Sequence, residues 1–160
     1  MAEKIDIAAT LSQVEGVVRE ELEALRQTIS DNINRTGKRA SGRTQNSLSV
    51  QVSQEGGAVV GSLDGRAFFG ALETGSQPWR TQYARPPKFF IEIIEEWMRD
   101  KGISGEAGGI AYAIMKRGSA QYRQGARTDV YSDDILKTMD EINRRVNGLF
   151  EAQIIDTLLR

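Results

Sequence analysis

Residues 11–33, LSQVEGVVREELEALRQTISDNI, place an apolar side chain at every third or fourth position. A helix turns once in about 3.6 residues, so side chains with this spacing fall on one stripe along its surface. We therefore predict a long amphipathic helix from about residue 5 to residue 33, roughly 40 Å long at 1.5 Å per residue. Its stripe comprises Leu11, Val14, Val18, Leu22, Leu25, Ile29 and Ile33.

The C-terminal part of the chain repeats this pattern. Ser132 is suited to cap the start of a helix, and Asp133 and Asp134 are favourably placed in its first turn. We expect both long helices to pack within their own domain, and a seam between subunits is the alternative. The second stripe comprises Ile135, Met139, Ile142, Val146, Leu149 or Phe150, Ile154 and Leu158.

Shorter elements are predicted between the two long helices. In residues 47–63, SLSVQVSQEGGAVVGSL, apolar and polar side chains alternate over 48–53, and a turn sequence then precedes a second short run, which indicates a β-hairpin. Short helices are predicted in RAFFGALETG (66–75), ending at Gly75, and in GGIAYAIMKRG (108–118), ending at Gly118. The polar segment 119–132 is predicted as a loop.

A better helix is predicted in PPKFFIEIIEEWMRDKG (86–102), where the prolines suit a first turn and Lys101-Gly102 suits an end. Its apolar face would comprise Phe90, Ile93, Ile94 and Trp97. The whole pattern predicts one α+β domain over residues 1–160. Long N- and C-terminal helices would pack with a small antiparallel hairpin and two or three short helices.

Composition restricts the functions that fit this chain. The 21 basic and 22 acidic residues nearly cancel, which argues against a dedicated nucleic-acid coat. The chain lacks cysteine and histidine, and therefore lacks the residues of most familiar catalytic and metal sites. The start MAEKIDIAAT is unlike an export signal, and no segment approaches about eighteen consecutive apolar residues. We expect synthesis in the cytoplasm and no membrane partner.

Familiar catalytic motifs are also missing. TGKRASG (36–42) has Arg39 where a phosphate-binding loop needs a hydroxyl, and GEAGG (105–109) lacks the spacing of a dinucleotide site. Adjacent acids such as Glu95 and Glu96 point in different directions on a helix. We predict no enzyme, no cofactor and no metal. The enzymatic alternative is a hydrolase that uses Glu73 and a second, convergent carboxylate.

The basic residues gather in segments that contain no acids. Eleven of the 21 lie within residues 32–54, 74–91 and 107–128. Solvated loops explain this distribution simply, and a surface for an acidic partner or for DNA phosphates is the sharper interpretation. Trp79, Tyr83 and Tyr122 lie among these residues and fit either kind of contact.

Three short motifs resemble a known family. SGRTQNSLSV (41–50), FFGALETGSQPW (68–79) and ARPPKFF (84–90) are similar to segments of the tail-completion and neck (head-tail joining) minor tail components of long-tailed bacteriophages. Thr44 stands where that family usually has an apolar residue, and WMRDKGI (97–103) resembles its version with an extra helix. The resemblance covers roughly residues 5–155.

The resemblance implies an α+β virion subunit that is assembled in the host cytoplasm and does no chemistry. Such a subunit would join a homo-oligomeric ring in the neck or tail and contact connector or tail proteins. Glu73 would pair with an arginine, for which Arg43 is the candidate, within or across subunits. The candidate contacts between subunits or layers are Arg43, Glu73, Gly75, Trp79, Arg80, Tyr83 and Arg85.

The basic loops have a second possible role within this expectation. They could line a channel and touch passing DNA weakly and without specificity, because the genome must slide. The candidates are Arg35, Lys38, Arg39, Arg123 and Arg127. Two further functions also fit the sequence: a free-standing nucleic-acid-binding protein and a tail-terminator ring subunit.

Overall fold

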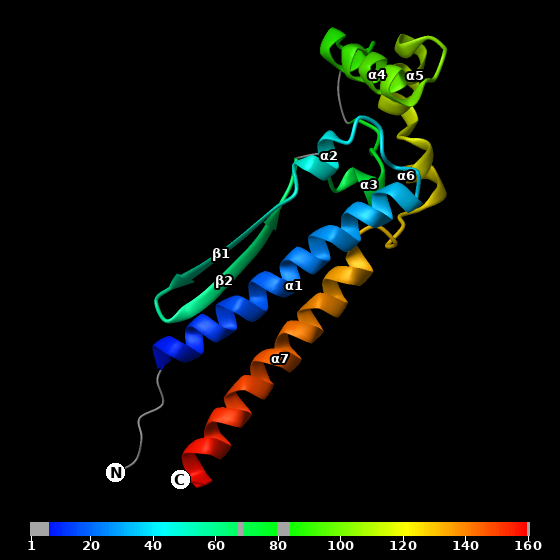
Figure 1. The fold of residues 1–160 in the computed structure, drawn as a ribbon. Helices are drawn as coiled ribbons and strands as arrows, with labels where there is room; N and C mark the ends of the chain where they lie inside the picture. Colours follow the sequence, from blue (N-terminus) through cyan, green and yellow to red (C-terminus); the bar gives the residue numbers. More distant parts are fainter. Residues whose placement is uncertain (1–6, 67–68, 80–83, 160) are drawn as a thin grey trace.

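A computed structural model of the 160-residue chain describes residues 7–66, 69–79 and 84–159 (Figure 1). Two long helices, α1 (Ile7–Arg35) and α7 (Ser132–Leu159), lie side by side. An antiparallel hairpin of β1 (Ser49–Glu55) and β2 (Ala58–Asp64) lies along α1. This layout confirms the predicted α+β fold with a long helix at each end.

Five shorter helices lie between α1 and α7 in the described residues, where the sequence predicted two or three. One of them, α6, lies in the segment predicted as a loop, because the Ser119 hydroxyl accepts the N–H of Tyr122 and caps it. The five are α2 (Arg43–Asn46), α3 (Ala71–Thr74), α4 (Lys88–Lys101), α5 (Ala107–Arg117) and α6 (Ala120–Gln124).

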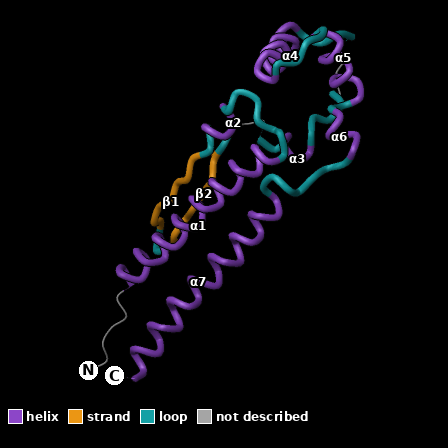
Figure 2. The backbone as a smooth tube through the Cα atoms, turned by 45° about the vertical axis from the view of Figure 1, so that its right-hand side comes forward, coloured by secondary structure: helices purple, strands orange, loops and turns teal. Residues whose placement is uncertain are grey.

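The hairpin, α1 and α7 form an elongated arm in which α1 is the middle layer (Figures 1 and 2). The predicted α1 stripe is largely confirmed, since Val14, Val18, Leu25, Ile29 and Ile33 are buried. The hairpin turns Val50, Val52, Val59 and Leu63 toward α1, and its serine-rich face, which also carries Val60, is exposed. The apolar face of the hairpin and part of the apolar stripe of α1 therefore cover each other.

Gly61 allows the hairpin to approach α1 closely. A β-carbon at this position would lie 2.6 Å from Val18 Cγ1 and 2.7 Å from Leu22 Cδ1. We expect Gly61→Ala to lower the free energy of unfolding by about 1–3 kcal/mol, because the valine is stiff and the hairpin must move outward. Urea unfolding followed by circular dichroism measures the change. Ser62→Ala, on the exposed face of the same strand, is the control and should shift stability by less than about 0.5 kcal/mol.

The apolar core is divided into two clusters. One lies where the arm ends, around Ile29, Ile33 and Val130, with Phe69 and Leu72 packed against it. The other lies between α4 and α5, which together we call the α4–α5 pair. Its buried members are Ile94, Met98, Ala107 and Ala111.

The predicted apolar face of α4 is only partly correct. Ile94 is buried as expected and Phe90 is half-buried, but the face continues through Met98, which the prediction omitted. Ile93 and Trp97 are 44% and 39% exposed. The face of α4 that packs on α5 is thus displaced toward Met98 from the predicted one. This displacement leaves Ile93 and Trp97 exposed to solvent. No helix in the described ranges is long and apolar enough to cross a lipid bilayer.

Candidate functional site

Glu73 lies on the short helix α3 and is only 2% exposed. Its Oε1 accepts the backbone N–H groups of Val130, Tyr131 and Ser132 at 2.9, 2.6 and 3.0 Å. The Ser132 hydroxyl donates to Oε2. These donors surround the first turn of α7, where unpaired N–H groups and the helix dipole both favour a negative charge. Glu73 is therefore the cap of α7.

The electrostatics of Glu73 follow from these contacts. Burial raises the pKa of its carboxyl, but the hydrogen bonds from Ser132, Tyr131 and Val130 together outweigh burial and lower the pKa. A general acid at neutral pH needs the opposite shift. The arrangement suits a carboxylate that is ionised at neutral pH and holds one helix against another segment.

Ser132 does not have the capping role that the sequence predicts for it. It is the first residue of α7, and its hydroxyl donates to the carboxylate that caps the helix. The cap lies 57 to 59 positions earlier in the chain than the amides it receives.

The predicted pairing of Glu73 with Arg43 does not occur within the chain. Arg43 lies on α2 and forms ion pairs with Glu96 at 2.6 Å and Asp100 at 3.4 Å, both on α4. Both oxygens of Glu73 are already occupied by the start of α7. Arg43 thus connects α2 to α4, and Lys101 adds a second connection by donating to the Gly37 carbonyl, just after α1, at 2.6 Å.

The backbone around Glu73 is held as firmly as its side chain. Its carbonyl accepts from Gln121 Nε2 at 2.8 Å and from the Arg127 N–H at 3.1 Å. Gly75, which ends α3 as predicted, has φ +71° and packs against the backbone of Tyr122. Ser119 closes the junction, since its N–H donates to the Ser76 carbonyl at 2.8 Å and its hydroxyl accepts the Ser76 N–H at 3.0 Å.

Three of the five residues predicted to meet DNA lie together near this junction. Arg35 donates to the Asp129 carbonyl, and Arg127 forms an ion pair with the Asp129 carboxylate. Burial, then the charges of Arg127 and Lys101, lower the pKa of Lys38 against the opposing effect of Asp129. Cations are therefore crowded here but partly neutralised.

Arg39 and Arg123, also predicted to meet DNA, are more exposed. Both are on the surface and form no ion pair within the described ranges. The structure does not place them in the cluster around Asp129, so the predicted set of five is only partly brought together.

Helix α4 carries an apolar surface that we call the α4 stripe, formed by Phe89, Ile93 and Trp97. Spaced four residues apart, they are 58%, 44% and 39% exposed. The ring of Trp79 stacks on Phe89 with centroids 6.3 Å apart and also contacts Phe90 at 4.6 Å. The predicted contact residue Trp79 thus adjoins the stripe.

The remaining predicted contact residues have different positions. Arg85 is exposed just before α4. Arg80 and Tyr83 lie outside the described residues.

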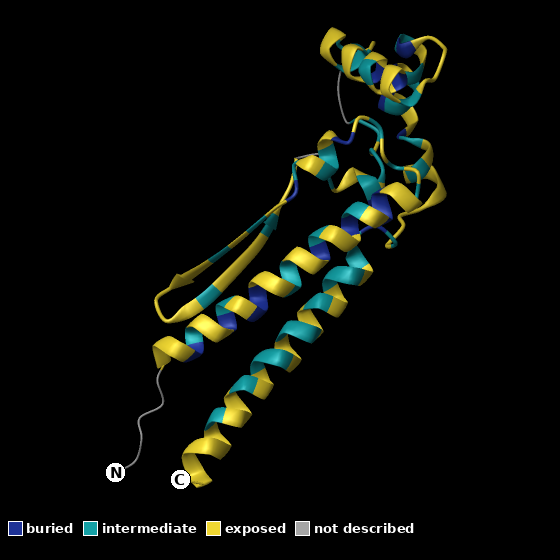
Figure 3. Ribbon diagram, in the orientation of Figure 1, coloured by how far each residue is buried: buried dark blue, intermediate teal, exposed yellow. Residues whose placement is uncertain are grey.

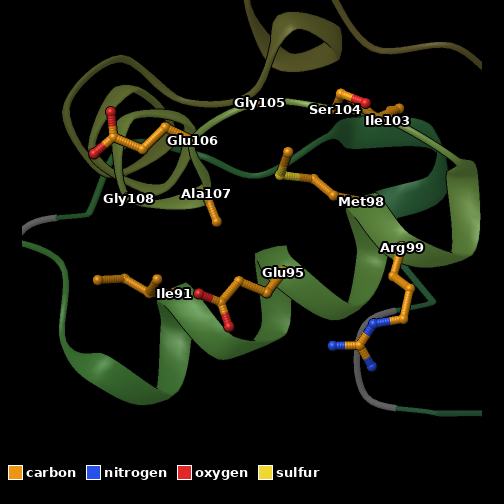
Figure 4. Close-up of a pocket in the computed structure, with 10 residues that line it drawn as sticks. All are labelled: Ile91, Glu95, Met98, Arg99, Ile103, Ser104, Gly105, Glu106, Ala107 and Gly108. Atoms are coloured by element: carbon orange, nitrogen blue, oxygen red, sulfur yellow. The ribbon is translucent and has the colours of Figure 1, made fainter.

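An open cavity of about 610 Å³ lies on the opposite flank of α4 from this stripe (Figure 4). Met98 and Ala107 belong to the same buried cluster, and Figure 4 shows Arg99 pointing away from both. The cavity mixes apolar and acidic side chains, and no group of three or more carboxylates in the described ranges could hold a metal ion. Its lining comprises Ile91, Glu95, Met98, Arg99, Ile103, Ser104, Gly105, Glu106, Ala107 and Gly108.

A scan against protein-family models and searches of curated proteins and solved structures found no match. The bacteriophage resemblance therefore remains a prediction that depends on residues 41–50, 68–79 and 84–90.

Sequence reasoning missed the partners of Glu73 and found only the residue itself. Gln121, Arg127 and Val130 have no distinctive spacing relative to Glu73, and only contact in three dimensions connects them with it. It also missed Phe89, whose exposure depends on how α4 turns against α5. The number of apolar residues on α4 could have predicted an exposed apolar face, because the helix has more of them than one neighbouring helix can cover.

Proposed function

We propose that this chain is a structural subunit of a bacteriophage neck or tail, forming part of a ring at the head-tail junction. It would contact neighbouring connector or tail proteins in the virion. The resemblance in residues 41–50, 68–79 and 84–90 supplies the biological setting. The exposed α4 stripe is the observation that supports an assembly role most directly.

The α4 stripe has the chemistry of a contact surface. Its three large side chains lie on one line of roughly 12 Å, from the 1.5 Å rise per residue, and Trp79 extends the apolar area at one end. Exposed apolar patches next to aromatic and arginine side chains are typical of protein interfaces. In a head-to-tail ring this surface would meet a different surface of the next copy.

A second candidate function, nucleic-acid binding, is supported by the cations around Asp129. Lys38 lies near the like charges of Arg127 and Lys101, and bound phosphate groups would reduce the repulsion among these cations. Binding of the purified protein to random-sequence DNA, with affinity falling steeply as salt rises, would favour this function. A tail-terminator ring would share the proposed surface and differ in its neighbours in the particle.

We expect negative-stain electron microscopy of the purified protein to show closed rings with one subunit count. Ile93→Asp should abolish the rings, because a charge in the centre of the α4 stripe would lose its hydration on contact. Helical content by circular dichroism should stay unchanged, since Ile93 is exposed.

Tyr112→Asp is the matched control. It places the same charge at an equally exposed aromatic position on α5, where Tyr112 is 47% exposed. Rings should persist in this variant. The proposal fails if the wild type stays monomeric at every concentration, or if Ile93→Asp assembles normally.

A further inference from the structure

Helix α7 is unusual because none of its 28 residues is buried. One side, which includes Ile135, Ile142 and Leu149, is half-buried against α1. A second line of apolar side chains runs beside it toward solvent, and Figure 3 shows exposed residues along the length of the helix. This outer stripe comprises Leu136, Met139, Phe150, Ile154 and Leu158, which are 64, 56, 44, 50 and 78% exposed.

The outer stripe is too long to match most surfaces of the molecule. From Leu136 to Leu158 it spans roughly 33 Å at 1.5 Å per residue. The α4 stripe covers only about a third of that length on the same geometry. The exposed face of the hairpin is mostly polar, with Ser49, Gln51 and Ser62 pointing outward beside a 48% exposed Val60. Within the described ranges, the outer stripe itself is the surface that matches in both length and polarity.

Charges along one border of the stripe indicate how two copies fit together. Lys137, Arg144 and Glu151 are spaced seven residues apart, so they lie on nearly the same line of the helix. Arg144 pairs with Glu141 on its own helix but keeps 71% of its side chain exposed, and Glu151 is exposed without an ion pair in the described ranges. A second α7 in the same direction and in register would set Arg144 beside Arg144. One in the opposite direction, with the two-fold axis near Asn147, would set Arg144 beside Glu151.

We infer that the outer stripe of α7 packs antiparallel against the outer stripe of a second copy of this chain, across a two-fold axis. Symmetry then forms the Arg144–Glu151 pair twice. In this register Phe150 faces Asn147 of the second copy and Ile154 faces Asn143, so polar amides lie in the middle and apolar side chains surround them. This contact goes beyond the proposed ring, because it joins two copies whether or not further copies close a circle.

Cross-linking tests the direction of the pair. The chain contains no cysteine, so a single introduced thiol reports one position. Asn147→Cys lies near the axis and should give a covalent dimer in high yield with a short bismaleimide. Leu136→Cys should not link to itself, because its symmetry mate is roughly 35 Å away along the helix. A mixture of Leu136→Cys and Leu158→Cys chains should link to each other.

Charge exchange tests the register. Arg144→Glu and Glu151→Arg should each weaken the dimer about tenfold or more in sedimentation equilibrium, since each sets like charges opposite each other. The double variant Arg144→Glu/Glu151→Arg should restore wild-type affinity. A merely structural effect on α7 would not be reversed in this way.

Three results would overturn the inference: a wild-type protein that stays monomeric, self-linking of Leu136→Cys, or no rescue by the double variant. The ring proposal is tested by different residues. Ile93→Asp should leave the α7 dimer intact, so failure of one proposal can be distinguished from failure of the other.

Discussion

Replacing Glu73 with alanine is expected to lower the free energy of unfolding by about 3–4 kcal/mol, the largest effect of any single side-chain truncation we propose. The loss leaves the N–H groups of Val130, Tyr131 and Ser132 without their acceptor at a junction where Glu73 and Val130 are buried. It also removes the negative charge from the start of a 28-residue helix. Urea unfolding monitored by circular dichroism measures the change.

Glu95→Ala is the matched control for this prediction. Glu95 is an exposed helical glutamate that accepts no hydrogen bond within the described ranges. Its loss should change stability by no more than about 0.5 kcal/mol. Equal effects at the two positions would show that the capping of α7 does not stabilise the fold.

The pH dependence of stability provides a separate test of the same carboxylate. The pKa of Glu73 is lowered in the folded protein from an ordinary value of 4.5. Its stabilisation is therefore complete above pH 4.5 and disappears as the pH falls through the lower folded value. Glu73→Gln keeps an oxygen acceptor but has no charge, so the wild type should be more stable at neutral pH. The difference between the two should shrink steadily as the solution becomes more acidic than this ordinary value, and a constant difference would contradict the ionised cap.

Gly75→Ala is expected to destabilise the protein by about 3 kcal/mol or more, because it combines backbone strain with a steric clash. Gly75 has φ +71° and ψ −179°, a conformation that almost only glycine adopts. A β-carbon there would lie 2.5 Å from both the Tyr122 backbone nitrogen and Ser119 Oγ. Backbone cannot turn away as a flexible side chain does, so the segment must shift. Thermal unfolding by calorimetry measures the loss.

Gly16→Ala provides the opposite expectation. Gly16 lies within α1 and has nothing within 4 Å of where its β-carbon would be. Alanine should stabilise the helix by about 0.5–1 kcal/mol through its better propensity. If both substitutions changed stability in the same direction, the specific role of the Gly75 junction would be wrong.

Sequence periodicity predicted the parts of this fold that depend on local pattern. The stripe from Leu11 to Ile33 and the alternation at the start of the hairpin each define one apolar face, and the long elements that lie beside each face cover it. Gly75 and Gly118 end their helices as predicted, because helix ends depend on nearby backbone conformation. Such features need no knowledge of distant residues.

The contacts that the sequence did not predict are those between distant segments. Glu73 stands out in the sequence as a lone acid, but its partners lie almost sixty residues later and are mostly backbone amides, which every residue except proline carries. The α4 face was predicted only in part, because Ile93 and Met98 are both apolar and only the position of α5 decides which is buried. The spacing of apolar residues shows that a helix has an apolar side. Which of those residues become buried depends on where the neighbouring helix packs.

The layered arm has a consequence for how the chain is made. A ribosome releases α1 first and α7 last, so the apolar side of α1 must wait for nearly the whole chain before its helical partner appears. The hairpin follows α1 after only a short connection, and it covers the side around Val18 and Leu22. The hairpin can therefore cover this side of α1 early in synthesis. The side of α1 that packs on α7 stays uncovered for longer, and we expect a chaperone to bind there.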